Sequence, residues 1–248
     1  MKKLLIVGYG RMGRVVEALA PEYGFEVAGQ LDSSNNAAGE ALTAERCRGV
    51  DVAIDFSSAA AVCANLPRLV ALGLDVVVGT TGWQAEEAAL RDAAQAAGVG
   101  VVAAPNFSAG VAIFDAIVER AAALFADQTS FDAWIHEAHH AAKRDAPSGT
   151  ALALERAMTR GGYPRPIDVS STRAGSIPGT HTVGFDGPAE TVTLTHATRD
   201  RSTFARGALE AARWVRGRKG WFTIRDVLGL RDADGTRGQW PVSAEQES

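Results

Sequence analysis

A glycine-rich turn near the N-terminus is the feature that most constrains the fold. Leu4–Val7 is an apolar run with the composition of a strand buried on both faces. The segment G-Y-G-R-M-G at Gly8–Gly13 follows it and matches G-x-G-x-x-G. Arg14–Ala20 is then amphipathic, and Phe25–Leu31 predicts a second strand that ends at Asp32. This order of strand, glycine turn, helix, strand and acid is typical of a dinucleotide-binding unit.

Each glycine of this pattern has a separate physical task. Gly8 permits the tight turn, Gly10 lets the backbone approach a pyrophosphate, and Gly13 lets helix and strand pack closely. The start of the helix offers free N–H groups and a positive dipole end to phosphates. A carboxylate at Asp32 can accept the ribose hydroxyls. We therefore predict a cofactor site at Gly8, Tyr9, Gly10, Arg11, Met12, Gly13 and Asp32, with a purely structural glycine turn as the alternative.

Strands and helices continue to alternate along the first half. Strands are expected at Val50–Phe56, Leu74–Val78 and Val99–Ala103, and helices at Ala59–Leu72 and Gln84–Ala97. This alternation predicts a doubly wound, Rossmann-type parallel sheet, whose ligands bind outside the carboxyl ends of the strands. Two polar turns follow strands and are predicted to belong to this rim, unless they are ordinary loops. Their residues are Gly79, Thr80 and Thr81 in one turn and Ala104, Pro105, Asn106 and Phe107 in the other.

The residues around Asp32 favour NADH over NADPH. A carboxylate at the end of the second strand repels a 2′-phosphate, and the following Ser33 and Ser34 supply no positive charge. Arg11 and Arg14, in the first helical turn, could offset part of this repulsion. Use of both cofactors therefore stays open.

The second half predicts a separate α+β domain. Strands without intervening helices indicate a mixed or antiparallel sheet. These strands are expected at Phe131–Ile135, Ile167–Arg173, Thr180–Phe185 and Glu190–Thr198, and helices at Asn106–Ala126, Thr150–Met158 and Phe204–Val215. We expect Phe222–Leu228 to return to the first domain. The predicted division is 1–105 plus about 217–230 for dinucleotide binding, 106–216 for substrate binding and oligomerisation, and 231–248 as a polar tail.

Composition narrows the function classes. The 248 residues carry a formal net charge of −4, so there is no overall positive field to attract nucleic acid or anionic lipid. No apolar run approaches the length of a membrane span. Cys47 and Cys63 show no metal or disulfide spacing, which fits a reducing cytoplasm. We expect a cytoplasmic protein that binds neither nucleic acid nor membrane.

The segment Glu137–Thr150, E-A-H-H-A-A-K-R-D-A-P-S-G-T, gathers polar groups suited to acid–base work. His139 and His140 can pass protons near neutrality, and Lys143 can donate a proton and hold an anion. The turn before Thr150 begins a helix whose free N–H groups suit a carboxylate or phosphate. Arg144 and Asp145 are expected to form a surface pair or to brace the loop. The alternative is a polar surface loop.

The same segment contains H-E-x-x-H, which binds zinc when it lies on a helix. Here the five residues His136–His140 follow a strand-like alternation, and Pro147 blocks a helix soon afterwards. We therefore predict no metal, although a zinc hydrolase built on His136 and His140 stays as a minor alternative.

The segment E-A-H-H-x-x-K-x-D-x-P-S-G-T-A resembles the signature of the 4-hydroxy-tetrahydrodipicolinate reductase (dihydrodipicolinate reductase) family. The resemblance covers nearly the whole chain. Its other motifs are I-D-F-S at Ile54–Ser57, G-T-T-G at Gly79–Gly82, A-P-N-F-S at Ala104–Ser108, R-x-G-x-x-x-G-x-H at Arg173–His181 and F-x-x-R-D-V-L at Phe222–Leu228.

The resemblance implies a reductase of lysine biosynthesis through diaminopimelate. NADH or NADPH would reduce a small cyclic dicarboxylate with loss of water, in an enzyme that is usually a homotetramer. His139 would donate or accept the proton, His140 would contact the substrate, Lys143 would donate a proton, and Gly149 and Thr150 would bind a substrate carboxylate. Ser33 stands where some members carry an arginine, which weakens the case for NADPH. A reductase of another dicarboxylate imine and a catalytically silent NAD-binding sensor are the alternatives.

Overall fold

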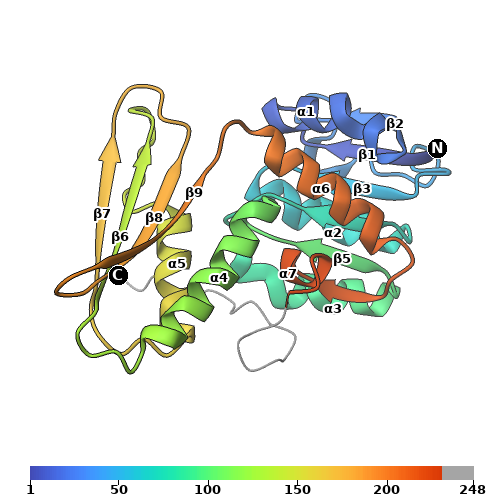
Figure 1. Cartoon of the computed structure of the whole chain (residues 1–248). Coiled ribbons are helices and arrows are strands. Elements are labelled where there is room, and N and C mark those ends of the chain that lie inside the picture. The colour runs from blue at the N-terminus through green and yellow to red at the C-terminus, as the bar shows by residue number, and fades with distance from the viewer. Residues whose placement is uncertain (231–248) are drawn as a thin grey trace. The chain divides into compact units, whose positions relative to one another are not determined.

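The computed structural model describes residues 1–230, which form two compact units (Figure 1). Unit 1 comprises Met1–Ser108 and Ser202–Gly229, and unit 2 comprises Ala109–Arg201. The chain therefore leaves unit 1 once and returns to it once. The predicted polar tail, 231–248, lies outside the described residues.

Unit 1 is built on a six-stranded sheet in the order β10-β5-β4-β3-β1-β2, in which every neighbouring pair is parallel. This confirms the predicted doubly wound sheet. The strands are β1 (Lys2–Val7), β2 (Phe25–Leu31), β3 (Val52–Asp55), β4 (Asp75–Val78), β5 (Gly100–Ala103) and β10 (Gly220–Phe222). The helices are α1 (Arg11–Leu19), α2 (Ala59–Ala71), α3 (Glu87–Ala97), α6 (Ser202–Val215) and α7 (Ile224–Val227), with 3₁₀ turns η1 (Ala20–Tyr23), η2 (Ala37–Gly39) and η3 (Gln84–Glu86).

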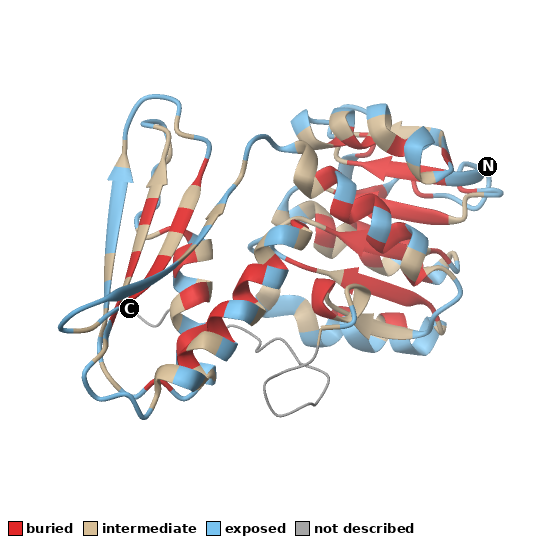
Figure 2. Cartoon of the chain, in the orientation of Figure 1, coloured by how far each residue is buried: buried red, intermediate tan, exposed pale blue. Residues whose placement is uncertain are grey.

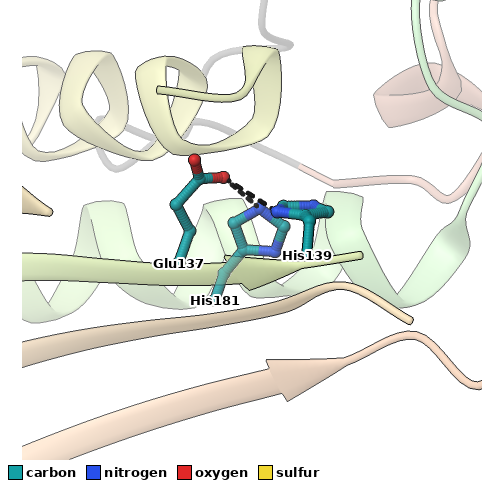
Figure 3. Close-up of side chains that lie close together, drawn as sticks. All are labelled: Glu137, His139 and His181. Atoms are coloured by element: carbon teal, nitrogen blue, oxygen red, sulfur yellow. Dashed lines mark ion pairs between the residues drawn. The ribbon is translucent and has the colours of Figure 1, made fainter. Parts of the chain in front are cut away.

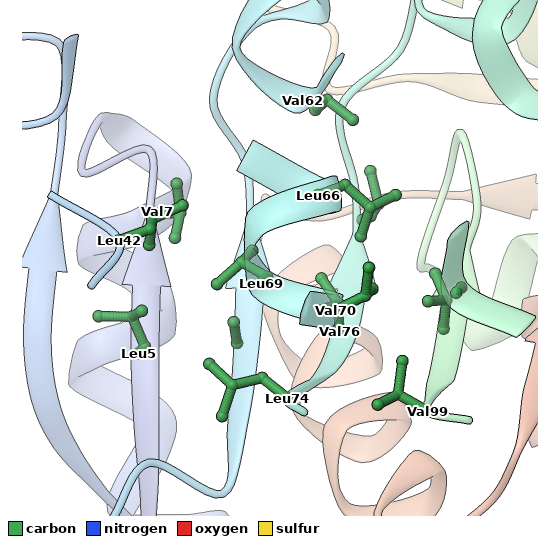
Figure 4. Packing of buried hydrophobic residues seen from close by; sticks show 14 of the residues in the cluster. Leu5, Val7, Leu42, Val62, Leu66, Leu69, Val70, Leu74, Val76 and Val99 are labelled. Carbon is green, nitrogen blue, oxygen red and sulfur yellow. The ribbon is translucent and has the colours of Figure 1, made fainter. Parts of the chain in front are cut away.

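Helices cover both faces of this sheet, which explains the unbroken apolar strands. Leu5 and Val7 join a cluster that includes Leu66 and Leu69 of α2 (Figure 4). Ile6 points to the other face, because a methyl group added at Gly13 of α1 would lie 3.2 Å from its Cγ2 atom. Figure 2 shows the central strands in the colour for buried residues. Burying each such aliphatic side chain contributes about 1.5–3 kcal/mol.

Helix α6 corrects the predicted domain boundary at residue 216. It packs against α1 and against β3, β4 and β5, so it belongs to unit 1. Its apolar stripe, which includes Ala205, Ala208, Leu209 and Ala212, is fully buried there. An amphipathic pattern shows that a helix has a buried face but cannot show which of two sheets covers that face. The prediction that the last element returns to the first domain is confirmed, because β10 pairs with β5.

Unit 2 contains a four-stranded mixed sheet in the order β7-β6-β8-β9, as predicted. Its strands are β6 (Asp132–His139), β7 (Ile167–Arg173), β8 (Thr180–Asp186) and β9 (Thr191–Ala197), and its long helices are α4 (Ala109–Phe125) and α5 (Gly149–Arg160). Strand β6 is parallel to β7 and antiparallel to β8. The core joins Val118 of α4 and Leu154 of α5 to Ile135 and Val183 of the sheet.

Strand β6 runs further than the sequence predicts. The alternating pattern predicts an end at Ile135, but the strand continues to His139 and therefore includes Glu137. The extension arises because both edges of β6 are paired with neighbouring strands, β7 and β8, through this polar stretch. Backbone hydrogen bonds on two sides hold a strand whose side chains are no longer apolar.

Candidate active site

The register of the unit 2 sheet brings three polar residues together. Glu137 on β6 lies opposite Ser171 on β7 and opposite His181 on β8. Residues directly opposite in neighbouring strands point to the same face. His139, two residues after Glu137 on β6, shares that face. The sheet therefore gathers residues that are far apart in the chain.

The Glu137 side chain is completely buried, and one of its oxygens is fully hydrogen-bonded. Oε1 accepts hydrogen bonds from the backbone N–H of Ser148 at 3.0 Å, the hydroxyl of Ser171 at 2.7 Å and Nη2 of Arg173 at 2.6 Å. Burial would raise the pKa of this carboxyl, but the bonds from Ser148, Arg173 and Ser171 outweigh it and lower the pKa to about 2. Glu137 is therefore ionised at neutral pH.

The other oxygen, Oε2, faces two imidazoles (Figure 3). Nδ1 of His139 lies 3.2 Å away and Nε2 of His181 lies 3.6 Å away. These three atoms, one each from Glu137, His139 and His181, lie within 4.8 Å of one another and could hold a metal ion. Arg173 already supplies a positive charge to the same carboxylate, so we interpret the cluster as an acid–base network.

Burial keeps both imidazoles neutral. Burial, with a smaller contribution from the neighbouring His139, lowers the pKa of His181 to about 4. Burial also lowers the pKa of His139, while the Glu137 carboxylate acts in the opposite direction. The hydroxyl of Ser148 lies 3.1 Å from Nε2 of His181 and accepts the backbone N–H of Ala151 at 3.2 Å.

Lys143 lies in the turn after β6, and its ammonium is held by a neighbouring carboxylate. Both carboxylate oxygens of Asp145 lie 2.7 Å from its Nζ atom. This corrects the expected pair between Arg144 and Asp145. Asp145 also braces the loop, because its backbone oxygen accepts a hydrogen bond from Arg173 at 2.5 Å. The Lys143 side chain retains 23% of its exposure, so the ammonium can reach a ligand.

The substrate residues predicted at the helix start lie beside this cluster. Ser148 is the N-cap of α5, and Gly149 and Thr150 occupy the first turn. Helix geometry leaves the N–H groups of this turn without partners inside the helix. A methyl group added at Gly149 would meet no atom within 4 Å, so the backbone there is open to a ligand. These residues suit an anion, and their assignment to the substrate stays a prediction.

The zinc-protease pattern is not formed, because its residues lie on a strand and not on a helix. His136 belongs to the face of β6 opposite Glu137, and its Nε2 atom lies 3.1 Å from the hydroxyl of Thr172. His140 follows directly after β6, where its backbone oxygen accepts the N–H of Lys143. The predicted role of His140 in contacting a substrate is untested by this geometry.

In unit 1, the three fingerprint glycines occupy three different environments. Gly8 has φ +89°, and a methyl group there would lie 2.4 Å from the backbone of Phe56. A methyl group at Gly13 would lie 2.5 Å from the carbonyl oxygen of Gly8. At Gly10, the N-cap of α1, it would meet nothing within 4 Å, and no side chain caps the helix. The open backbone at a helix start fits a pyrophosphate.

The other predicted cofactor residues gather at the same rim. Tyr9, Arg11 and Met12 surround the start of α1, and the hydroxyl of Tyr9 donates to Glu17. Asp32 follows β2, and its Oδ1 atom accepts the N–H and hydroxyl of Ser34 at 2.8 and 2.5 Å. The two remaining turns follow β4 and β5, at Gly79, Thr80 and Thr81 and at Ala104, Pro105, Asn106 and Phe107.

The close packing of these turns gives Gly79 a structural role as well. A methyl group there would lie 2.1 Å from the ring of Phe56, which itself packs edge to face on Phe107 with centroids 6.4 Å apart. Trp83 donates its indole N–H to the carbonyl of Thr80 at 2.7 Å. Direct binding of a cofactor by these turns stays a prediction.

The sequence did not single out several members of the cluster. Sequence patterns present Glu137 only as part of a motif and indicate no role for Ser148, Ser171, Arg173 or His181. Two features of the sequence could have pointed to these residues. One is the motif at Arg173–His181, and the other is the acidic Glu137 in a strand-like alternation. Neither reveals a cluster, because the contacts depend on strand register.

Comparisons with known proteins point to the same family in both halves of the chain. Residues 2–107 match the family model described as dihydrodipicolinate reductase, N-terminus, and residues 110–228 match the model for its C-terminus. The 4-hydroxy-tetrahydrodipicolinate reductase of Xanthomonas euvesicatoria is 43% identical, over 91% of this chain and 97% of that protein. The enzyme of the same name from Thiobacillus denitrificans is 39% identical, over 90% and 96%.

A solved structure shares the fold. It is a dipicolinate-bound dihydrodipicolinate reductase from Paenisporosarcina, with a TM-score of 0.75 and 23% identity, and the match covers 90% of this chain and 97% of that one. In residues 1–230, no helix combines the length and apolar character needed to cross a bilayer. The chain belongs to the dihydrodipicolinate reductase family.

Proposed function

We propose that the protein reduces 4-hydroxy-tetrahydrodipicolinate to tetrahydrodipicolinate, with loss of water, in lysine biosynthesis through diaminopimelate. Membership in a reductase family whose relatives carry this activity in their names supports the reaction. The observation that supports the site assignment is that His139 and the start of α5 both meet Glu137, with Lys143 in the turn that follows β6.

The substrate is a small dicarboxylate, and two groups suit its negative charge. The N–H groups of Gly149 and Thr150 anchor one carboxylate at the positive end of α5. Lys143, in the turn after β6, supplies a cation and would exchange its Asp145 partner for the substrate. His140 orients the bound ring. Anchoring through fixed backbone groups positions the substrate at little entropic cost.

Proton transfer falls to His139 and Lys143. The bound nicotinamide cofactor supplies a hydride, and the negative charge that reduction places on the substrate requires a proton. Lys143 is charged and can donate a proton at Nζ. The lowered pKa of His139 keeps the imidazole neutral, so that one ring nitrogen can accept a proton while the other releases one.

Family membership and the Rossmann-type sheet support a nicotinamide cofactor. Gly10 and the uncapped start of α1 would hold the pyrophosphate, and Asp32 would hold the adenine ribose. The hydroxyl and backbone N–H of Ser34 lower the pKa of Asp32, so its carboxylate is ionised. We propose a preference for NADH, because this charge repels a 2′-phosphate. We further propose a cytoplasmic homotetramer, which light scattering after size exclusion would test.

The decisive experiment compares NADH and NADPH oxidation with freshly generated cyclic substrate. We expect turnover with both cofactors and a higher kcat/KM with NADH. No oxidation of either cofactor would contradict the function and favour an NAD-binding sensor. Faster oxidation with a different dicarboxylate imine would move the assignment to another substrate.

A further inference from the structure

We propose that Glu137 is the positioning residue of the site, and that it serves two groups at once. One oxygen fixes the ring of His139 with its proton on Nδ1, and the other holds the start of α5 where the substrate carboxylate binds. This inference rests on the proposed function, because it assigns a role in the same reaction. Glu137 itself touches neither substrate nor cofactor in this proposal.

The bonds to Oε1 tie together three separate segments. Ser171 and Arg173 come from β7, and the N–H of Ser148 comes from the N-cap of α5, one residue before Gly149. The donors are 11 to 36 residues distant from Glu137 in the chain. Charge-assisted hydrogen bonds to a buried carboxylate are strong and directional. Moving this oxygen would therefore move the anchor for the substrate.

The environment of Oε2 determines which nitrogen of His139 carries the proton. Nδ1 of His139 is buried and lies 3.2 Å from Oε2, yet it is not aligned for a straight hydrogen bond. Oε2 likewise lacks an aligned donor among the described residues. Such bonds in ligand-free sites often straighten when the substrate binds. An ionised carboxylate accepts only, so Nδ1 must be the donor.

The opposite edge of the His139 ring is set by Gly179. A methyl group at Gly179 would lie 3.3 Å from both Cδ2 and Nε2 of His139, and the backbone there has φ +113°. Glycine at this position therefore leaves room for the edge that carries Nε2. With Nδ1 turned to Glu137, Nε2 is the nitrogen that exchanges a proton during the reaction.

Several titratable groups lie around His139 besides Glu137. Lys143 and Asp145 lie in the turn after β6, Arg173 lies on β7, and His181 lies on β8 with His196 of β9 behind it. Lys143 and Arg173 disfavour the imidazolium, whereas Glu137 and Asp145 favour it. Removal of the Glu137 charge therefore lowers the pH at which His139 loses its proton.

The variant Glu137→Gln tests the proposal with little change in shape. Its amide oxygen can still accept at Oε1, while its NH₂ group replaces Oε2 and would force Nδ1 to become an acceptor. We expect kcat to fall roughly 10²-fold, within the range for a disturbed proton-transfer group. The KM for substrate should stay close to that of the wild type. Because the working form of His139 is neutral, the acidic limb of the kcat–pH profile should move to lower pH.

Two further variants separate positioning from folding. Glu137→Ala loses both oxygens, so it should raise the KM for substrate as well as lower kcat. Asp132→Asn removes an exposed carboxylate at the other end of β6 and should behave as wild type. An unshifted pH limb and unchanged kcat in Glu137→Gln would overturn the proposal.

Nitrogen-15 NMR of the histidines gives a readout that does not depend on turnover or on the variants folding. We expect Nδ1 of His139 to carry the hydrogen in the wild-type protein, and an Nε2–H form there would overturn the inference. Failure of the proposed function is distinguishable, because wild-type protein would then oxidise neither cofactor while the NMR result still stood.

Discussion

The imidazoles of His139 and His181 meet edge to face, with ring centroids 5.0 Å apart and planes inclined by 72°. Each turns one nitrogen toward the same oxygen of Glu137. They come from antiparallel neighbours, β6 and β8, so their contact depends on the register of that pair. Two imidazoles that burial keeps neutral therefore face one buried, ionised carboxylate.

Replacement of Lys143 should separate chemistry from cofactor binding. Lys143→Ala is expected to lower kcat roughly 10²–10⁴-fold, the usual cost of losing a proton-transfer group. The Kd for NADH, measured by fluorescence titration, should not change, because the predicted cofactor residues lie in unit 1. Arg144→Ala is the control, since Arg144 is exposed and adjacent. Wild-type turnover in Lys143→Ala would contradict the assignment.

Two glycines of the fingerprint should have different roles: Gly10 in cofactor binding and Gly13 in packing of the fold. Gly10→Ala adds a methyl group that meets no protein atom, so the free energy of unfolding should change by less than about 0.5 kcal/mol. The Kd for NADH should rise roughly tenfold, about 1.4 kcal/mol. Gly13→Ala places a methyl group 2.5 Å from the Gly8 oxygen and should destabilise the fold by about 1–3 kcal/mol. Urea unfolding and NADH titration of both variants test this division.

Asp32 should control the choice of cofactor. Asp32→Ala removes the charge that opposes a 2′-phosphate, while Arg11 and Arg14 remain nearby at the start of α1. The ratio of kcat/KM for NADPH to that for NADH should rise about tenfold, because repulsion between close charges is worth on the order of 1 kcal/mol or more. Ser33→Ala, at the exposed neighbouring position, should leave the ratio unchanged. An unchanged ratio in Asp32→Ala would remove this residue from the cofactor site.

Acidification should destabilise the protein in two steps. Between pH 6.5 and about 4 the unfolded chain protonates His181 while the folded protein does not, so stability falls by about 3 kcal/mol. Between pH 4.5 and about 2 the same holds for Glu137, whose folded carboxylate stays ionised. Urea unfolding at a series of pH values measures both steps. In His181→Asn, the free energy of unfolding should fall less between pH 6.5 and 4 than in the wild type, while the fall below pH 4.5 should remain. An equal fall between pH 6.5 and 4 in variant and wild type would contradict the role assigned to His181.

The pattern of apolar runs and turns was enough to predict the parallel sheet, because strands buried on both faces have an unmistakable composition. Leu4–Val7 is such a run and lies within β1, whereas Phe25–Leu31, predicted as a strand that ends at Asp32, forms the partly exposed β2. The rim residues followed from the topology, because loops after parallel strands lie at the same edge. Asn106–Ala126 was predicted as one helix, which begins three residues later at Ala109.

By itself the sequence determined the fold class, the family signature and the segment that carries His139 and Lys143, since these depend on local periodicity and spacing. Only the tertiary structure decided that α6 packs in unit 1 and that Glu137 joins Arg173, 36 residues further along the chain. The physical reason is the same in both cases. Sheet order and register decide which sheet covers a helix and which residues become cross-strand neighbours. Both arise from contacts between segments that are distant in the chain.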